Sequence, residues 1–283
     1  MSAPRASEDA YAHCQALVRA SDKDRFIATL FVPAQRRPHL FALYAFNLEI
    51  ARIGAIAHEP LAGEIRLQWW HDCLSGGDVA GHPVARALLD TVASRGLAAQ
   101  PLLDLIDARR FDVYAEPMAT LSEFEAYVRR TSCGLFGMAA RIIDEKVGAD
   151  EVADAAGLAY GISALVAAVG AHAARGRVYV PADVLGRHGA GPDDVLAGRS
   201  SPAVAAALND LILGAERQYE TFFALAKRMP APVRAAFLPV ATVPLALRRM
   251  RARKDDAQRV IEVSPLRRLQ ALLRAALFGF PKP

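Results

Sequence analysis

The fold of this chain is decided by the stretch FIATLFVPAQRRPHLFALYAFNLEIAR, which runs from Phe26 to Arg52. Side chains in its second half recur at positions i, i+3, i+4, i+7 and i+8, as on one face of an α-helix: Leu40, Leu43, Tyr44, Asn47 and Leu48. Pro33 and Pro38 bracket a turn ahead of this face, because proline lacks the amide proton that a helix interior needs. We therefore predict a helix through Tyr44.

The same helical period extends along most of the chain. Its longest run is Leu208, Leu211, Ile212, Ala215, Tyr219, Phe222 and Phe223. The only strand-like run is Arg177–Val180, which is β-branched and aromatic and is ended by Pro181. Because no repeat, linker or shift in composition divides the chain, we predict one all-α domain over residues 1–283, with about ten helices.

Composition excludes several classes of protein. The chain has 283 residues, is 53% hydrophobic and 23% charged, and carries a net charge of +4. A disordered chain has fewer large apolar residues and a stronger charge bias. The three cysteines, Cys14, Cys73 and Cys133, are too few and too far apart for a disulfide scaffold or a compact metal knuckle. As free thiols they fit a reducing compartment.

The positive charge is concentrated near the C-terminus. Between Arg248 and Arg274 there are nine Lys or Arg residues and three Asp or Glu residues, a net charge of +6, whereas the remaining residues sum to −2. A basic end on a nearly neutral body argues against a general nucleic-acid-binding protein.

Residues 265–280 predict a basic amphipathic helix. Its apolar stripe is formed by Leu266, Leu269, Leu273 and Phe280, and three basic side chains lie off that stripe: Arg267, Arg268 and Arg274. This pattern is typical of a helix that lies on an anionic membrane surface. An ordinary last helix docked on the core fits the pattern equally well.

The chain shows neither a signal peptide nor a convincing membrane span. Met1–Asp9 is polar, and no apolar segment follows it. Ala155–Ala174 lacks charge over a length that could span a bilayer, but it is rich in Ala and Gly and contains Ser163 and His172. We interpret it as a buried core helix, and we predict a cytoplasmic protein with peripheral contact to the inner membrane.

Motifs for phosphate loops, nucleophile elbows and zinc helices are absent from the sequence. Two pairs of acids have the i, i+4 spacing that can share a Mg²⁺ ion, Asp112 with Glu116 and Asp150 with Asp154. The first pair precedes Pro117, which indicates a solvated helix end. The second pair begins a helix, where acids complement the helix dipole. We therefore predict no metal site.

Four segments, in this order and spacing, resemble the squalene/phytoene synthase family. They are the opening stretch, HPVARALLDTV from His82, YVRRTSCGLFG ending at Gly137, and GISALVAAVGAHAARGRVYVP over Gly161–Pro181. The resemblance covers the chain from about Tyr11 to about Leu277. It implies an isoprenoid-synthase-type helical bundle around a central apolar cavity, in agreement with the helical period.

Active members of the family hold Mg²⁺ and prenyl diphosphates with two Asp-rich motifs on opposing helices. The first motif places Cys-Arg directly after Tyr44-Ala45-Phe46 and acids a few residues further on. Here Asn47 stands at the cysteine position, and the acidic positions hold Ala51, Arg52 and Ala55. Without carboxylates, the ionising diphosphate loses its main electrostatic support, and one such lost group can cost about 10²–10³ in rate.

The second motif departs from the family in the same way. Its positions hold Ala164, Ala168 and His172, whereas the framework residues Arg177 and Tyr179 that follow them match the family. Because no acid remains in either motif, the resemblance implies no cofactor, and Mg²⁺ belongs only to an enzyme alternative.

A few residues near these motifs are candidate ligand contacts. Tyr44 and Tyr179 either line a lipid-sized cavity or pack in the core, and Arg177 lies beside Tyr179. Arg52 could meet a phosphate or form an ion pair with Glu49. Glu49 is the one acid near the first motif, and helical geometry turns it away from the face of Ala51.

A branch of the family with similarly eroded motifs includes a mitochondrial complex I assembly factor and its bacterial relatives. FNLEIA, Gln68-Trp69-Trp70 and His172 resemble that branch more than the active synthases. We therefore favour a non-catalytic homologue that aids assembly of the respiratory NADH dehydrogenase at the membrane face, together with an apolar isoprenoid or quinone-like ligand. The alternatives are an active Mg²⁺-dependent condensing enzyme and a peripheral lipid-binding protein.

Overall fold

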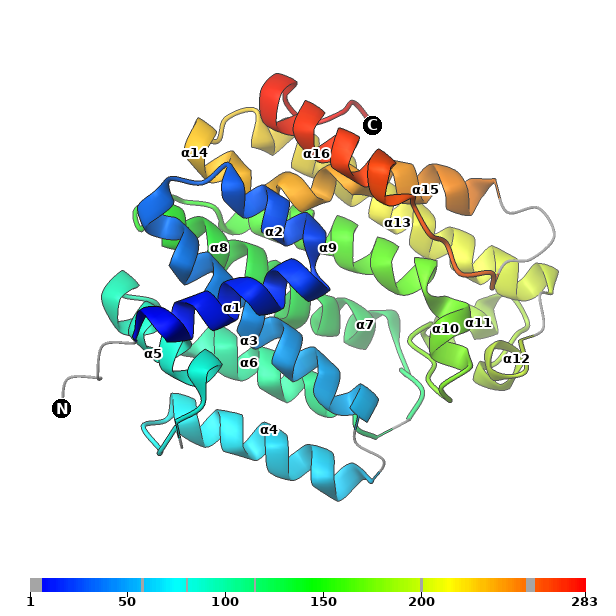
Figure 1. The fold of residues 1–283 in the computed structure, drawn as a ribbon. Helices are drawn as coiled ribbons and strands as arrows, with labels where there is room; N and C mark the ends of the chain where they lie inside the picture. The colour runs from blue at the N-terminus through cyan, green and yellow to red at the C-terminus, as the bar shows by residue number, and fades with distance from the viewer. Residues whose placement is uncertain (1–6, 57–58, 80, 115, 199–200, 253–257) are drawn as a thin grey trace. The chain divides into compact units, whose positions relative to one another are not determined.

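The structure is a computed structural model that describes residues 7–56, 59–79, 81–114, 116–198, 201–252 and 258–283. Within these ranges it is helical and contains no β-strand, so the all-α prediction is confirmed (Figure 1). Several expected helices are divided into shorter segments, so the described residues contain more helices than about ten.

The chain forms two compact units from interleaved segments. The first unit comprises Met1–Tyr114, Gly134–Ala153 and Met229–Pro239, and the second comprises Ala115–Cys133, Asp154–Arg228 and Val240–Pro283. The prediction of one domain with a central cavity stays a prediction, and each unit is described by itself.

The first unit is built around one apolar helix. Its helices are α1 (Glu8–Ser21), α2 (Lys23–Leu30), a 3-10 turn η1 (Ala34–Arg36), α3 (Arg37–Ile56), α4 (Pro60–Leu74), α5 (Pro83–Arg95), α6 (Gln100–Arg110), α8 (Gly134–Ile143) and α14 (Ala231–Arg234). Every residue of α3 from Leu40 to Asn47 is buried, and a helix that is apolar on all sides must be covered on all sides. Accordingly, α1, α4, α5, α6 and α8 all contact α3, and α4 lies along α6 at the edge of this unit (Figure 1).

The second unit contains α7 (Leu121–Val128), a π-helical turn η2 (Arg129–Cys133), α10 (Val169–Ala173), α11 (Ala182–Arg187), α12 (Pro192–Leu196), α13 (Pro202–Ala226), α15 (Val243–Arg251) and α16 (Pro265–Phe278). Two helical segments pass from one unit into the other, α9 (Asp150–Ala167) and the 3-10 segment η3 (Ala235–Thr242). The longest helical run of the sequence becomes α13, which buries the predicted face from Leu208 to Phe222 against α11 and α15.

The small residues of α9 permit close helix packing within the second unit. A Cβ atom at Gly157 would collide with the backbone of Cys133, and one at Gly161 would lie 2.6 Å from Val128 Cγ1. These two glycines are one turn apart, so together they form a smooth strip on which α7 and η2 rest. The Ala/Gly-rich stretch is therefore core, as predicted from its composition.

That stretch is nevertheless two helices and not one. The break falls at Ala168, where φ is −102° and ψ is 10°, between α9 and α10. The strand-like run Arg177–Val180 forms no strand. Its Val178 carbonyl accepts the Met118 N–H at 3.3 Å, which is an isolated bond and not a ladder. No described helix is long and apolar enough to cross a membrane.

Candidate functional site

The face of α3 that carries the first motif positions begins with Tyr44 and Asn47. Tyr44 is buried, with the Arg25 guanidinium carbon 5.5 Å from its ring centroid. Asn47 is also buried, and its Oδ1 has no hydrogen-bond partner among the described residues. Further along this face, Ala51 is half-buried and Ala55 is exposed.

Arg52 and Glu49 lie to the side of that face. The Arg52 Nη2 donates a hydrogen bond of 2.5 Å to Ser21 Oγ, so a hydroxyl is its partner in the structure. Arg52 and Glu49 instead line a common surface hollow between α3 and α4, to which Ala51 does not contribute.

The side chains at the first motif positions do not fit a Mg²⁺ ion. Asn47 presents an amide, Ala51 and Ala55 present methyl groups, and Arg52 presents a guanidinium. Magnesium prefers carboxylate and phosphate oxygens, and a guanidinium repels it. This part of α3 therefore offers none of the ligands through which the active family members hold a diphosphate.

The structure separates the second motif positions from one another. Ala164 on α9 lines a hollow of about 380 Å³, whereas His172 on α10 lines a cavity of about 10 Å³, which has room for about one water molecule. Ala168 lies between them at the helix break. The carbonyl of Ala168 still accepts the His172 N–H at 2.9 Å, so the backbone bonding continues through the break.

His172 packs against the framework tyrosine that the sequence singled out. Its ring centroid is 4.7 Å from that of Tyr179, at an interplanar angle of 63°, and Tyr179 in turn contacts Tyr127 at 5.6 Å. Gly176, with φ of +72°, lets the chain turn back so that the Arg177 N–H reaches the His172 carbonyl at 3.0 Å. Histidine and tyrosine thus form one packed aromatic cluster beside the small cavity.

The lining of the larger hollow includes Ser163, which the sequence showed only as a polar residue within an Ala/Gly-rich stretch. It is lined by Tyr160, Ser163, Ala164, Ala167, Thr242, Val243, Ala246, Ile261, Glu262, Val263, Pro265 and Arg268. Ser163 is only 3% exposed, and its Oγ has no hydrogen-bond partner among the described residues. A buried hydroxyl without a partner is costly, so it marks a place where a ligand could supply the missing bond.

Helix α16 turns one of its arginines toward this hollow. Arg268 is half-buried and lines the hollow, whereas Arg267 and Arg274 are exposed. The helix docks through buried Leu272 and Ala275, which lie on a different face from the predicted apolar stripe. Leu269 is half-buried, and Phe280 lies beyond the helix end, where its ring contacts Phe222.

An exposed apolar row therefore remains on α16. It consists of Leu266, Leu273 and Leu277 at i, i+7 and i+11, with Phe278 close by. Arg267 and Arg274 are exposed beside this row. Four further charged residues of the basic C-terminal region, Arg253, Lys254, Asp255 and Asp256, lie outside the described residues.

Three of the four paired acids are engaged by arginines, and Glu116 is exposed. Asp112 is only 3% exposed and accepts a bond of 2.9 Å from Arg109 Nη1, so the expectation of a solvated helix end there was wrong. The physical reason is Gly54 of α3, which packs directly onto the Asp112 backbone and covers it. In the other pair, Asp150 meets Arg141 at 2.6 Å, and Asp154 accepts a bond from Arg129 Nε at 3.1 Å.

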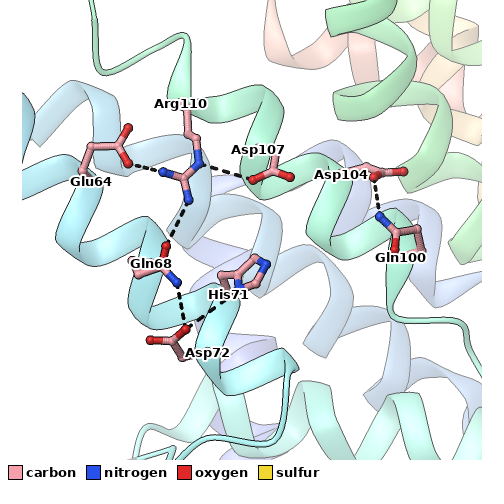
Figure 2. Close-up of polar contacts among 8 residues, drawn as sticks. All are labelled: Glu64, Gln68, His71, Asp72, Gln100, Asp104, Asp107 and Arg110. Carbon is pink, nitrogen blue, oxygen red and sulfur yellow. Dashed lines mark hydrogen bonds and ion pairs between the residues drawn. The ribbon is translucent and has the colours of Figure 1, made fainter.

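A chain of polar contacts joins α4 to α6 on the edge of the first unit (Figure 2). Arg110 on α6 reaches Glu64 and Gln68 on α4 as well as Asp107 on its own helix, and Gln68 also donates to Asp72 at 2.8 Å. These contacts explain how α4 is held against α6. Among the residues that the structure describes, no three His, Cys, Asp or Glu side chains are grouped so that they could hold a metal ion.

Comparison with known proteins agrees with these observations. The sequence profile of squalene/phytoene synthase matches residues 18–269. A rat protein named NADH dehydrogenase (ubiquinone) complex I, assembly factor 6 is 28% identical over 234 residues, which is 81% of this chain and 70% of the rat protein. The 15-cis-phytoene synthase of Synechocystis is 29% identical over 210 residues, or 68% of this chain and 61% of that enzyme.

The fold also matches a solved structure. A squalene synthase from Alicyclobacillus acidocaldarius superposes with a TM-score of 0.75 at 23% identity, covering 89% of this chain and 96% of that one. This likeness confirms the predicted isoprenoid-synthase-type fold. The profile match extends over most of the sequence and includes the stretches around both motifs. The chain therefore belongs to the squalene/phytoene synthase family.

Proposed function

We propose that this chain acts in the assembly of respiratory complex I and does not condense prenyl diphosphates. The observation that carries the proposal is the set of side chains on α3, where two methyl groups and a guanidinium, those of Ala51, Ala55 and Arg52, occupy the positions of the family's metal-binding acids. Similarity to the complex I assembly factor of rat supports the assembly role. Similarity to a phytoene synthase keeps the condensing enzyme as the alternative.

Two experiments separate these functions. Deleting the gene in its host should lower the amount and activity of assembled NADH dehydrogenase, and the wild-type gene should restore both. An unchanged level of NADH dehydrogenase would contradict the assembly role. Separately, the purified chain should release no diphosphate from farnesyl or geranylgeranyl diphosphate with Mg²⁺. Formation of squalene or phytoene would establish the alternative.

The hollow around Ser163 is our candidate for an apolar isoprenoid or quinone-like ligand. Its volume of about 380 Å³ lies within the range of small-molecule sites, which are mostly apolar with a few polar groups that orient the ligand. Alanine and valine side chains supply the apolar lining here. The unpartnered Ser163 hydroxyl would donate to a carbonyl or hydroxyl oxygen of the ligand.

A thermal-shift titration tests this ligand. A short-chain benzoquinone and geranylgeraniol are the two probes, and at least one should raise the melting temperature of the wild-type chain but not of Ser163→Ala. Ser122→Ala, at an exposed position in the same unit, is the matched control and should respond like the wild type. If neither probe stabilises the wild type, or if both serine variants respond equally, the hollow is not this ligand's site.

The exposed row on α16 supports contact with an anionic membrane from the cytoplasmic side. Leucines beside arginines are typical of a helix that lies in the membrane interface. Leu273→Glu should reduce flotation of the chain with anionic liposomes, whereas Leu213→Glu, an exposed leucine on α13, should leave flotation unchanged. Equal flotation of both variants would remove α16 from the membrane contact.

A further inference from the structure

A second surface of the molecule lies beside the first motif and contains neither Ser163 nor His172. It is a hollow of about 480 Å³ on the first unit, between α3, α4 and His82. The α3 residues that line it are spaced at i, i+3, i+4 and i+7: Glu49, Arg52, Ile53 and Ile56. Of the first motif positions only Arg52 lines this hollow, whereas Asn47, Ala51 and Ala55 follow a different face of the same helix. The hollow therefore lies beside the motif face of α3 and shares only Arg52 with it.

The edge of this hollow is unusually apolar for an exposed surface. Ile56 is 53% exposed, Leu61 is 69% exposed and Ile65 is 61% exposed. Leu61 and Ile65 are one turn apart on α4, so they form an apolar ridge beside the hollow. Clustered exposed aliphatic side chains of this kind mark an interaction surface.

One wall of the hollow is rigid. Trp69, Trp70 and His82 pack against one another with ring centroids 5.1–5.3 Å apart, and Trp70 also packs on Phe46 at 5.2 Å. Because these rings are already held by their neighbours, an occupant would not have to order them on binding. The three rings lie too close together for a cation to fit between them, so they form a wall of the hollow and not an aromatic cage for a cation.

The hollow also presents charges of both signs. Glu49 is half-buried and Arg66 is exposed, and neither makes a hydrogen bond or ion pair with another described residue. Arg52 already donates a hydrogen bond to Ser21 of its own chain. A carboxylate in a partly apolar hollow is stabilised by a cationic partner, and an exposed arginine next to an apolar ridge can supply one.

We propose that this surface binds a second copy of this chain in a two-fold symmetric dimer. The ridge of Leu61 and Ile65 enters the hollow of the partner, and Arg66 meets Glu49 of the partner subunit. A two-fold axis makes each contact twice, so a surface that carries both a ridge and a hollow, and both an acid and a base, is complementary to itself. A small apolar ligand in the hollow would leave Leu61, which does not line the hollow, exposed and unused.

The first test is the association state of the full chain. Sedimentation over a range of protein concentrations should show a monomer–dimer equilibrium for the wild type. Ile65→Glu should weaken the dimer at least about tenfold, because it places an unpaired charge in an apolar contact. Leu30→Glu is the matched control, since Leu30 is 44% exposed on α2 of the same unit and should dimerise like the wild type.

A charge-reversal mixture tests the pairing itself. Glu49→Arg alone and Arg66→Glu alone should each be mostly monomeric, because each homodimer would contain two like-charged pairs. An equimolar mixture of the two variants should dimerise. In the heterodimer each chain carries two charges of one sign and faces two charges of the opposite sign, so both pairs across the interface attract.

Three results would overturn the proposal. They are a wild-type chain that stays monomeric at every concentration, a dimer that Ile65→Glu leaves intact, and a mixture no more dimeric than its components. In the first case the surface would be left for a different protein or a small apolar ligand. The comparison of Ile65→Glu with Leu30→Glu decides the question even if Glu49→Arg fails to fold, because Leu30 and Ile65 are both exposed.

Discussion

Replacing Ser163 with alanine should make the ligand-free chain more stable. Ser163 is 3% exposed and its Oγ lacks a hydrogen-bond partner, and leaving such a group unsatisfied costs about 1–3 kcal/mol. Alanine removes that oxygen and places a methyl group beside Ala164 and Ala167, at the edge of a hollow that already exists. Because the new cavity surface is small, we expect a net gain of about 1 kcal/mol, and each kcal/mol raises the melting temperature by about 2–4 °C.

Urea and thermal unfolding of the ligand-free chain measure this change. Ser122→Ala is the control, since an exposed substitution should stay within about 0.5 kcal/mol of the wild type. A loss of about 1 kcal/mol or more for Ser163→Ala would refute the reasoning. It would mean that the hydroxyl donates to a carbonyl of its own helix, as buried helical serines often do. No change at all would mean that water already satisfies it.

Three further predictions concern two half-buried groups and one buried group of the first unit. Tyr11→Phe removes the bond from Tyr11 Oη to Asp90 Oδ2 at 2.6 Å and should cost about 1.5–3 kcal/mol in urea unfolding, whereas a loss below about 0.5 kcal/mol would show that the bond contributes little. Burial lowers the folded-state pKa of His39, so the unfolded chain binds more protons and stability should fall as pH drops through about 6.5 toward the folded pKa. His39→Gln should make the free energy of unfolding depend less steeply on pH. Part of the pH dependence should remain, because burial also lowers the pKa of His82. An unchanged slope would contradict the assignment of this pH dependence to His39. Burial raises the pKa of the Cys14 thiol to about 12, so mass spectrometry should find it unlabelled by iodoacetamide at neutral pH until the chain is denatured, and rapid labelling of the folded chain would disprove its burial.

Local signals in the sequence mark where several helices begin. The Asp22 side chain caps α2 by accepting the Arg25 N–H at 3.0 Å, and Thr120 with Glu123 forms the capping box of α7. Pro83 occupies the first turn of α5, as expected from its fixed φ. Helix starts of this kind can be recognised in a sequence because a cap depends on side chains and amides within three residues of one another.

Features that depend on a distant neighbour were predicted less well. Asp112 is buried because Gly54, far away in the sequence, packs on its backbone. The docked face of α16 runs through Leu272 and Ala275 and not along the predicted stripe, because several faces of that helix are apolar. A hydrophobic pattern of this kind does not say which face meets the core.

The sequence by itself determined that the chain is helical, that it belongs to the squalene/phytoene synthase family, and which residue types stand at its motif positions. These follow from periodicity and from residue identity, which need no third dimension. Only the tertiary structure decided that Ala164 and His172 open onto different hollows, that Arg268 turns inward, and that the Ser163 hydroxyl is left without a partner. Helical spacing places a side chain around the axis of its own helix, but the groups that it meets come from other helices.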